Sequence, residues 1–185
     1  ITVSAGTSAG ISSIFFTSSD TGYVTLGYDG TMRKTIDGGL TWAECLVTTK
    51  VLYSVYFVDA NRGYVTGTGG IIMKTMDGGS TWDSLTSCST ELFYAVYFFN
   101  ESSGYAIGEN GTIIHTLNGG SSWTYQNSGI TQRLMNVRFT DINTGYAVGD
   151  YGIILKTIDG GTSWNMIPKA TEADLYSVCF TAADT

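Results

Sequence analysis

Apolar and polar residues alternate in short stretches along the whole chain. In the stretch 53–58, Val55 and Phe57 are two residues apart and therefore share one face of an extended strand. The same pattern recurs at Val96 and Phe98, Val137 and Phe139, and Val178 and Phe180. This period of two predicts short β-strands with one buried face, and none of the stretches has the length or period of a helix.

Glycine-rich turns separate these stretches. In the second unit the pattern predicts four strands, over 53–58, 63–67, 71–75 and 81–85. The second and third strands of each unit are joined by turns such as Gly67-Thr68-Gly69-Gly70 and Gly108-Glu109-Asn110-Gly111. Glycine and asparagine supply the positive φ that tight hairpins require, so adjacent strands are predicted to pair antiparallel.

The pattern is an internal repeat of about 41 residues. Trp42, Trp82, Trp123 and Trp164 are spaced by 40, 41 and 41 residues, and Gly-Tyr pairs begin at 22, 63, 104 and 145. A repeated unit of four antiparallel strands is the sequence signature of a β-propeller blade. We therefore predict an all-β fold in which 1–185 is one partial β-propeller, with blades over about 11–51, 52–92, 93–133 and 134–174 and the start of a fifth at 175–185.

The ends of the chain match pieces of neighbouring units. Residues 2–4 fall where the last strand of a preceding unit belongs, and 175–185 repeat the start of a unit. Closed propellers usually have four to eight blades. The sequence is thus predicted to be part of a longer protein; the alternative is self-assembly, in which a strand of one chain completes a blade of another.

The turn between the third and fourth strands is the most regular motif. It runs from Thr35 to Trp42 in the first copy and reads Thr-Ile-Asp-Gly-Gly-Leu-Thr-Trp. The carboxylate is expected to accept bonds from N–H groups of its own turn, and the indole to pack across the hairpin. We predict a structural role for all four copies: Asp37 and Trp42, Asp77 and Trp82, Asn118 and Trp123, Asp159 and Trp164. Each copy offers one carboxylate at most, so no metal site is expected.

This turn resembles the Asp-box, or BNR repeat, of sialidase-type propellers. The longer pattern Gly-Tyr-x-x-Gly-x-x-Gly-x-Ile-x-x-Thr-x-Asp-Gly-Gly-x-Thr-Trp is similar to the photosystem II assembly and stability factor family and its secreted bacterial relatives. The resemblance implies a seven-bladed ring, a non-catalytic role in protein assembly, and an extracytoplasmic location: secreted, cell surface, periplasm or thylakoid lumen. It also implies an arginine-rich patch, but Arg33, Arg62, Arg133 and Arg138 occupy non-equivalent positions of the repeat.

Composition narrows the classes of partner. The formal net charge is −7, from 16 acidic and 9 basic residues, without the basic cluster that nucleic acid requires. No stretch reaches the roughly 18 apolar residues of a membrane span. The three cysteines form no Cys-x-x-Cys and His115 is the only histidine, so neither a zinc site nor another cofactor is predicted.

Sequence variation between the repeats is concentrated in the turns between the second and third strands and in the links between blades. Variable loops on a constant scaffold are where propellers carry specificity. We predict a binding face for a protein or glycan partner there, with the candidate residues Tyr28, Asp29, Glu109, Asn110, Asp150 and Tyr151.

Three functions remain open from the sequence. The first is a non-catalytic binding or assembly propeller, and the second is a surface adhesin or filament module. The third is a glycoside hydrolase of the sialidase or xyloglucanase kind, which requires two carboxylates flanking the scissile bond. Asp29, Glu109 and Asp150 occupy equivalent turns, with nothing to raise the pKa of one above the others, so we do not expect an enzyme.

Overall fold

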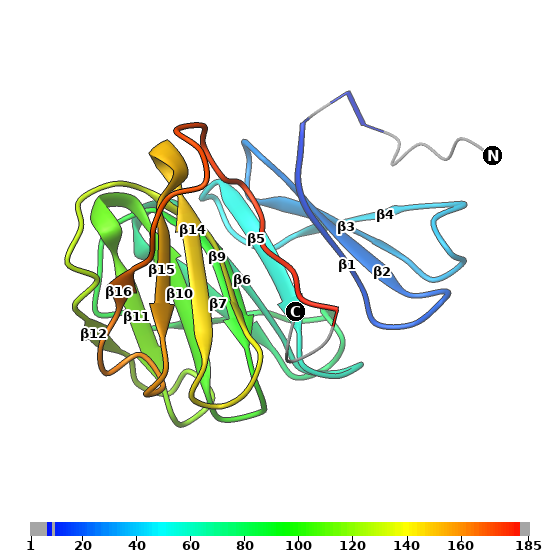
Figure 1. Cartoon of the computed structure of the whole chain (residues 1–185). Coiled ribbons are helices and arrows are strands. Elements are labelled where there is room, and N and C mark those ends of the chain that lie inside the picture. Colours follow the sequence, from blue (N-terminus) through cyan, green and yellow to red (C-terminus); the bar gives the residue numbers. More distant parts are fainter. Residues whose placement is uncertain (1–6, 9, 182–185) are drawn as a thin grey trace.

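The computed structural model describes residues 7–8 and 10–181 of the chain. They form four separate four-stranded antiparallel sheets, each with its strands in sequence order (Figure 1). The predicted all-β propeller architecture is confirmed. The strands are β1 (Ile11–Phe16), β2 (Gly22–Leu26), β3 (Thr31–Thr35) and β4 (Ala43–Leu46); β5 (Leu52–Phe57), β6 (Gly63–Gly67), β7 (Ile72–Thr75) and β8 (Asp83–Leu85); β9 (Phe93–Phe98), β10 (Gly104–Gly108), β11 (Ile113–Thr116) and β12 (Thr124–Gln126); β13 (Leu134–Phe139), β14 (Gly145–Gly149), β15 (Ile154–Thr157) and β16 (Asn165–Met166).

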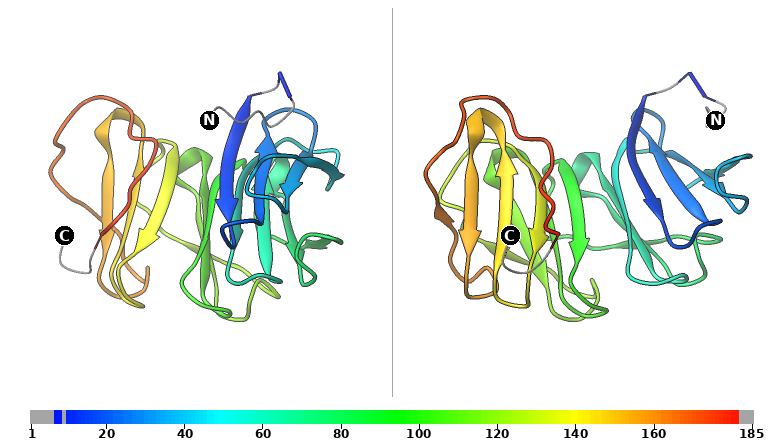
Figure 2. Two further views of the ribbon diagram at one scale, coloured as in Figure 1. Left: turned by 90° about the vertical axis from the view of Figure 1, so that its right-hand side faces the viewer. Right: turned by 45° about the vertical axis from the view of Figure 1, so that its right-hand side comes forward.

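The sheets stand side by side as blades of a partial ring, with the first strand of each on the inside (Figure 2). Adjacent first strands are linked by hydroxyl groups: the Val55 amide donates to Ser13 Oγ (3.3 Å), and the Val96 amide to Ser54 Oγ (3.2 Å). Aromatic rings continue this contact, since Tyr56 meets Tyr97 edge-on at 5.3 Å. Radial packing thus buries the faces that one blade alone would expose.

The Gly-Tyr pair has a packing explanation. A Cβ on Gly104 would lie 2.5 Å from the ring of Phe98 in the same blade, so only glycine leaves room for that ring. The adjacent Tyr105 stacks on Phe139 of the next blade, with ring centroids 4.2 Å apart. The glycine of the pair therefore allows packing within its own blade, and the tyrosine joins that blade to the next one. The same stacking pairs Tyr23 with Phe57 and Tyr64 with Phe98.

The segment that follows the fourth sheet does not form a strand. Residues 175–181 were predicted to begin a fifth blade, but in the structure they have no regular secondary structure. The Leu175 amide bonds to the Gly149 carbonyl (3.0 Å), and the Phe180 ring lies 4.9 Å from Tyr146, tilted by 41°. Phe180 thus contacts Tyr146 as the first-strand phenylalanine of a following blade would. A strand requires, in addition, a ladder of backbone hydrogen bonds. Residues 2–4 and 182–185 lie outside the described residues.

Candidate functional site

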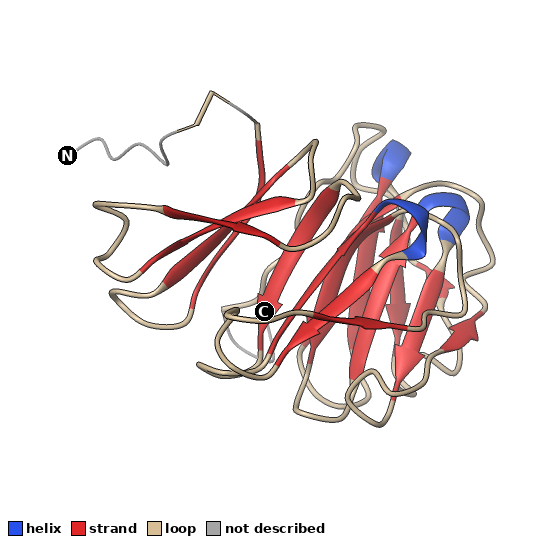
Figure 3. Ribbon diagram, turned by 180° about the vertical axis from the view of Figure 1, so that it is seen from behind, coloured by secondary structure: helices blue, strands red, loops and turns tan. Residues whose placement is uncertain are grey.

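The predicted variable loops lie on one face of the propeller. Three of the turns between second and third strands are single 3-10 turns: η1 (Thr68–Gly70), η2 (Glu109–Gly111) and η3 (Asp150–Gly152). They lie together at the edge opposite the Asp-box turns (Figure 3). We call this edge the loop face and the other the Asp-box face. Each 3-10 turn is tied to the preceding link between blades, as when the Asp150 amide donates to the Arg133 carbonyl (3.1 Å).

The Asp29 carboxylate is hydrogen-bonded within its own turn. Its Oδ1 accepts bonds from the Thr31 amide (3.1 Å) and the Thr31 hydroxyl (2.5 Å). These bonds, that of the hydroxyl first, lower the pKa of the carboxyl group below its usual value. The neighbouring Tyr28 side chain is exposed. Asp29 is therefore suited to hold a turn, and poorly suited to act as a general acid.

Glu109 and Asn110 extend the loop face at the third blade. Glu109 accepts a long hydrogen bond from the Tyr94 hydroxyl (3.4 Å). Asn110 adopts the left-handed φ of 54° in the middle of its turn, and its amide donates to Glu91 (3.0 Å). Both side chains thus lie at the outer surface with polar groups available to a partner.

Asp150 is buried and paired with Arg133. The Arg133 Nε donates to Asp150 Oδ2 at 2.6 Å, while Oδ1 has no partner among the described residues. The side chain of Asp150 is 9% exposed and that of Arg133 is 48% exposed. The carboxylate raises the pKa of the Arg133 guanidinium further above its usual value. Asp150 therefore orients the arginine, and the guanidinium is the group that solvent and partners can reach.

Arg133 also lies over the ring of Tyr94, which is not among the predicted site residues. Its guanidinium carbon is 6.0 Å from the centroid of Tyr94, and Tyr94 meets Tyr53 edge-on at 5.4 Å. We call Tyr53, Tyr94, Arg133 and Asp150 the arginine–tyrosine cluster. Tyr53 and Tyr94 belong to the first strands β5 and β9, Arg133 to the link before β13, and Asp150 to η3. The 41-residue spacing of the two tyrosines was visible in the sequence, but their contact with Arg133 follows from the packing of blades.

Tyr151 follows Asp150 and projects from η3. It adopts a left-handed φ of 56°, and its side chain is 60% exposed. The Tyr151 amide donates to Asp174 Oδ1 (3.0 Å), which ties the turn to the link after the fourth blade. An exposed ring on an anchored turn is a suitable contact for a sugar or a peptide.

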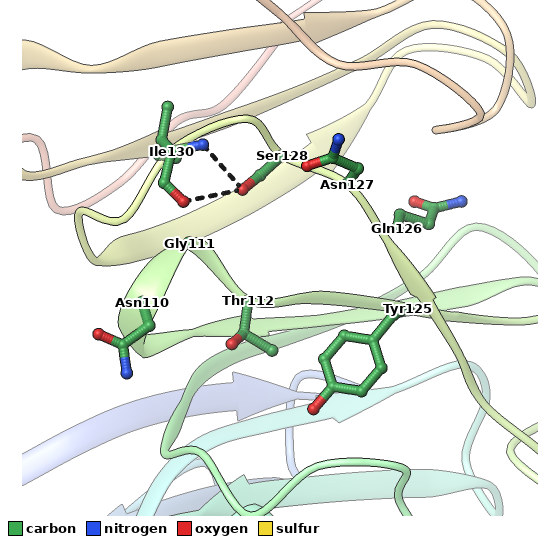
Figure 4. A pocket seen from close by; sticks show the side chains of 8 residues that line it. All are labelled: Asn110, Gly111, Thr112, Tyr125, Gln126, Asn127, Ser128 and Ile130. Carbon is green, nitrogen blue, oxygen red and sulfur yellow. Dashed lines mark hydrogen bonds between the residues drawn. The ribbon is translucent and has the colours of Figure 1, made fainter.

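A pocket of about 400 Å³ lies beside η2 (Figure 4). Asn110 and Thr112 line it from the third blade's turn, and Tyr125 and Asn127 line it from the last strand and the following link. The Ser128 hydroxyl bonds locally to the backbone of Ile130 (3.4 Å). Side-chain amides beside an exposed tyrosine are groups that bind sugar hydroxyls or peptide backbone. Of the predicted site residues, only Asn110 lines this pocket.

The Asp-box residues have structural contacts. Asp77 accepts bonds from the Thr81 amide (2.9 Å) and the Thr81 hydroxyl (2.7 Å), which lower the pKa of its carboxyl group to about 2. Asn118 accepts the equivalent amide bond from Ser122 (2.9 Å). Each of the four box tryptophans meets a phenylalanine ring of its own blade nearly at right angles. These tryptophans are Trp42, Trp82, Trp123 and Trp164. Asp37 and Asp159 repeat the contacts of Asp77.

The described part of the chain holds no cluster of three or more His, Cys, Asp or Glu side chains placed to bind a metal ion. Within the same residues, no helix is long and apolar enough to cross a membrane. The three cysteines, Cys45, Cys88 and Cys179, are all free thiols.

The four sheets and the box turns define this chain as an Asp-box β-propeller. Residues 44–129 match the family model described as photosynthesis system II assembly factor YCF48. The chain is therefore a propeller similar to the photosystem II assembly factors in sequence, as the longer repeat pattern indicated. No curated protein sequence matches it.

Solved structures support the fold. YCF48 bound to D1 peptide matches with a TM-score of 0.76 and 22% identity, over 95% of this chain and 58% of that chain. The chain thus spans less than two thirds of the length of that structure. The WD40 β-propeller domain of Doa1 matches with a TM-score of 0.77 and 11% identity, over 96% of this chain and 60% of that one. An ancestral GH74 enzyme matches with a TM-score of 0.68 and 17% identity, over 85% of this chain and 25% of that one.

Proposed function

We propose that this chain is part of a non-catalytic, extracytoplasmic propeller that binds a protein partner through its loop face. The observation that carries the proposal is the arginine–tyrosine cluster. Tyrosine and arginine are enriched among the few residues that dominate binding energy at protein interfaces, because they combine large apolar area with directed hydrogen bonds. Arg133 is half exposed yet held by Asp150 and Tyr94, so less conformational entropy is lost when it engages a partner.

The comparisons support the same class of function. The family model is that of an assembly factor, and the similar YCF48 structure is a complex with a D1 peptide. A peptide or a loop of a protein is thus the partner class that we propose. The extracytoplasmic location rests on the same resemblance.

The glycosidase alternative has weaker support in the geometry. Asp29 is bonded within its own turn and Asp150 is paired with Arg133, which leaves Glu109 alone among the three candidate carboxylates. A glycosidase requires two carboxyl groups facing one bond, one of them protonated. Glycan binding without turnover fits the pocket beside Asn110, and a surface adhesin could use the same loop face.

The proposal is tested by selecting peptides from a displayed random library on the purified chain and measuring their affinity by fluorescence anisotropy. We expect Arg133→Gln and Tyr94→Ala each to weaken the selected peptides at least about tenfold, as for interface anchors. The matched control is Arg62→Gln. It makes the same change in a residue that pairs with Asp59 and Glu101 at turns on the Asp-box face.

Two outcomes would overturn the proposal. One is that the selected peptides bind equally well to the loop-face variants and to the control. The other is hydrolysis of a chromogenic xyloglucan oligosaccharide that Asp29→Asn, Glu109→Gln or Asp150→Asn abolishes, which would make the chain an enzyme.

A further inference from the structure

Neighbouring blades are joined by a repeated pair of hydrogen bonds on the Asp-box face. The Tyr64 hydroxyl and the Lys74 ammonium both donate to the Gly119 carbonyl of the next blade, at 3.0 and 2.9 Å. The first interface is equivalent, with Tyr23 and Lys34 donating to Gly78 at 2.8 and 2.7 Å. In both, the lysine ammonium also lies 5.5 Å from the centre of the tyrosine ring. An internal lysine thus fills the space between blades.

The third interface lacks this lysine. His115 occupies the equivalent position, and its ring lies flat against Tyr105, with centroids 4.3 Å apart and planes 10° apart. The Gly160 carbonyl accepts from the Tyr105 hydroxyl (3.0 Å) and, in place of an ammonium, from Gln126 Nε2 (3.3 Å). A pocket of about 310 Å³ lies beside His115, between the third and fourth blades.

The lining of this pocket favours a cation. Its polar lining includes Asp159, Asn143 and Ser103. Hydrogen bonds from Ser163 and Thr157 lower the pKa of Asp159, which keeps it ionised near neutral pH. No arginine or lysine lines the pocket in the described part of the chain.

The remaining side chains suit an alkyl stem. Leu117 and Ile142 line the same pocket and are 72% and 44% exposed, so their apolar surface faces an entering ligand. Burial lowers the pKa of His115, whose Nε2 lies 3.2 Å from Ser103 Oγ. The neutral imidazole adds no charge that would repel an ammonium group.

We propose that this pocket binds the side chain of a lysine from a partner protein. Its ammonium group bonds to the Asp159 carboxylate, whose Oδ2 accepts one hydrogen bond, from the Ser163 hydroxyl, and its methylene groups pack on Leu117 and Ile142. The protein's own repeat supports this chemistry, because the two other interfaces hold a lysine ammonium beside the equivalent turn. This site is on the Asp-box face and is independent of the loop-face function proposed above.

The test uses His115 as a single-residue probe. Because it is the only histidine, its ring protons give one unambiguous set of NMR signals. We expect saturable shifts of these signals and of the Gly160 amide on titration with N-acetyl-lysine methylamide, with a dissociation constant on the order of 1 mM. N-acetyl-norleucine methylamide and the Nε-acetylated lysine analogue should give no saturable shift, because both lack the charge.

Two variants sharpen the test. Asp159→Asn should weaken lysine binding at least about tenfold, as expected when one charged partner is removed, and Asn118 shows that this turn accepts asparagine. His115→Lys places a lysine in the pocket and should abolish binding, read at the Gly160 amide. Equal shifts from the norleucine analogue, or unchanged affinity in Asp159→Asn, would overturn the proposal.

A third arm separates a partner lysine from a free amine. A pentapeptide with a central lysine should bind at least as tightly as butylammonium if the pocket admits a side chain carried by a backbone. Weaker binding of the peptide than of butylammonium would show that the backbone is excluded, and would overturn the assignment to a protein partner.

Discussion

The Tyr64 hydroxyl donates a hydrogen bond to the Gly119 carbonyl, 55 residues further along the chain and in the next blade. The ring of the same tyrosine stacks on Phe98 of that blade at 3.8 Å. One side chain thus joins two blades through both a polar and an apolar contact. The interfaces between blades therefore depend on a few side chains at fixed places in the repeat, which leads to the following predictions.

Replacing Tyr64 by phenylalanine should lower the free energy of unfolding by about 1 kcal/mol, because the buried bond to Gly119 is lost while the ring stacking remains. Urea denaturation followed by tryptophan fluorescence measures the change. Tyr28→Phe, at an exposed ring, is the control and should leave the midpoint unchanged. Equal midpoints for the two variants would contradict a stabilising role for the Tyr64 hydroxyl.

Gly104→Ala should destabilise the third blade by about 1–3 kcal/mol through overpacking. The added methyl would meet the Phe98 ring at 2.5 Å, and the backbone there is extended, so the effect is steric. Adding Phe98→Leu, which makes room for the methyl, should make the two effects less than additive. The comparison is Gly10→Ala, where a Cβ meets nothing within 4 Å. If Gly104→Ala costs no more than that control, the steric explanation of the Gly-Tyr pair is wrong.

The box carboxylates should give the fold an acid-sensitive component. The pKa values of Asp37 and Asp77 are lowered to about 2, below the unfolded value of about 3.9. Each therefore stabilises the fold fully above the unfolded pKa, and this contribution is lost as the pH falls through the folded pKa. Urea midpoints measured between about pH 5 and pH 2 should fall less steeply in the double variant Asp37→Asn/Asp77→Asn. An unchanged slope would show that these bonds do not favour the ionised form.

His115 and Gln126 should be energetically coupled. Gln126→Leu removes one donor to Gly160, and should cost about 1 kcal/mol. Adding His115→Lys restores the arrangement of the second interface, where Lys74 donates and Leu85 occupies the place of Gln126. The double variant should therefore regain the lost stability. A double-mutant cycle by urea denaturation measures the coupling, and simple additivity of the two changes would contradict it.

Much of the fold could be predicted because it repeats. The strands expected at 53–58, 63–67, 71–75 and 81–85 lie within one or two residues of β5 to β8. Alternating apolar positions indicate the buried face of each strand, and glycines indicate the turns. Both signals depend only on residues close together in the chain. The exception is 175–181, where the same local pattern has no ladder of backbone bonds to make it a strand.

The candidate site was predicted less completely. The loop face and its residues were expected from the variable turns, but Asp29 is bonded within its turn and Asp150 is buried. The two tyrosines of the arginine–tyrosine cluster, Tyr53 and Tyr94, belong to strands whose other residues form the core. Nothing local distinguishes a first-strand tyrosine that meets an arginine of the link to the next blade from one that packs in the interior.

The sequence by itself determined the four-stranded blade, its period and the chemistry of its turns, because strand pairing and tight turns depend on residues close together in the chain. Only the tertiary structure decided which side chains meet between blades: Arg133 over Tyr94, and His115 in a space that lysine fills elsewhere. The first contact involves the link between two blades, and the second lies at the interface with the next blade. Both depend on the radial packing of whole sheets, which no local pattern encodes.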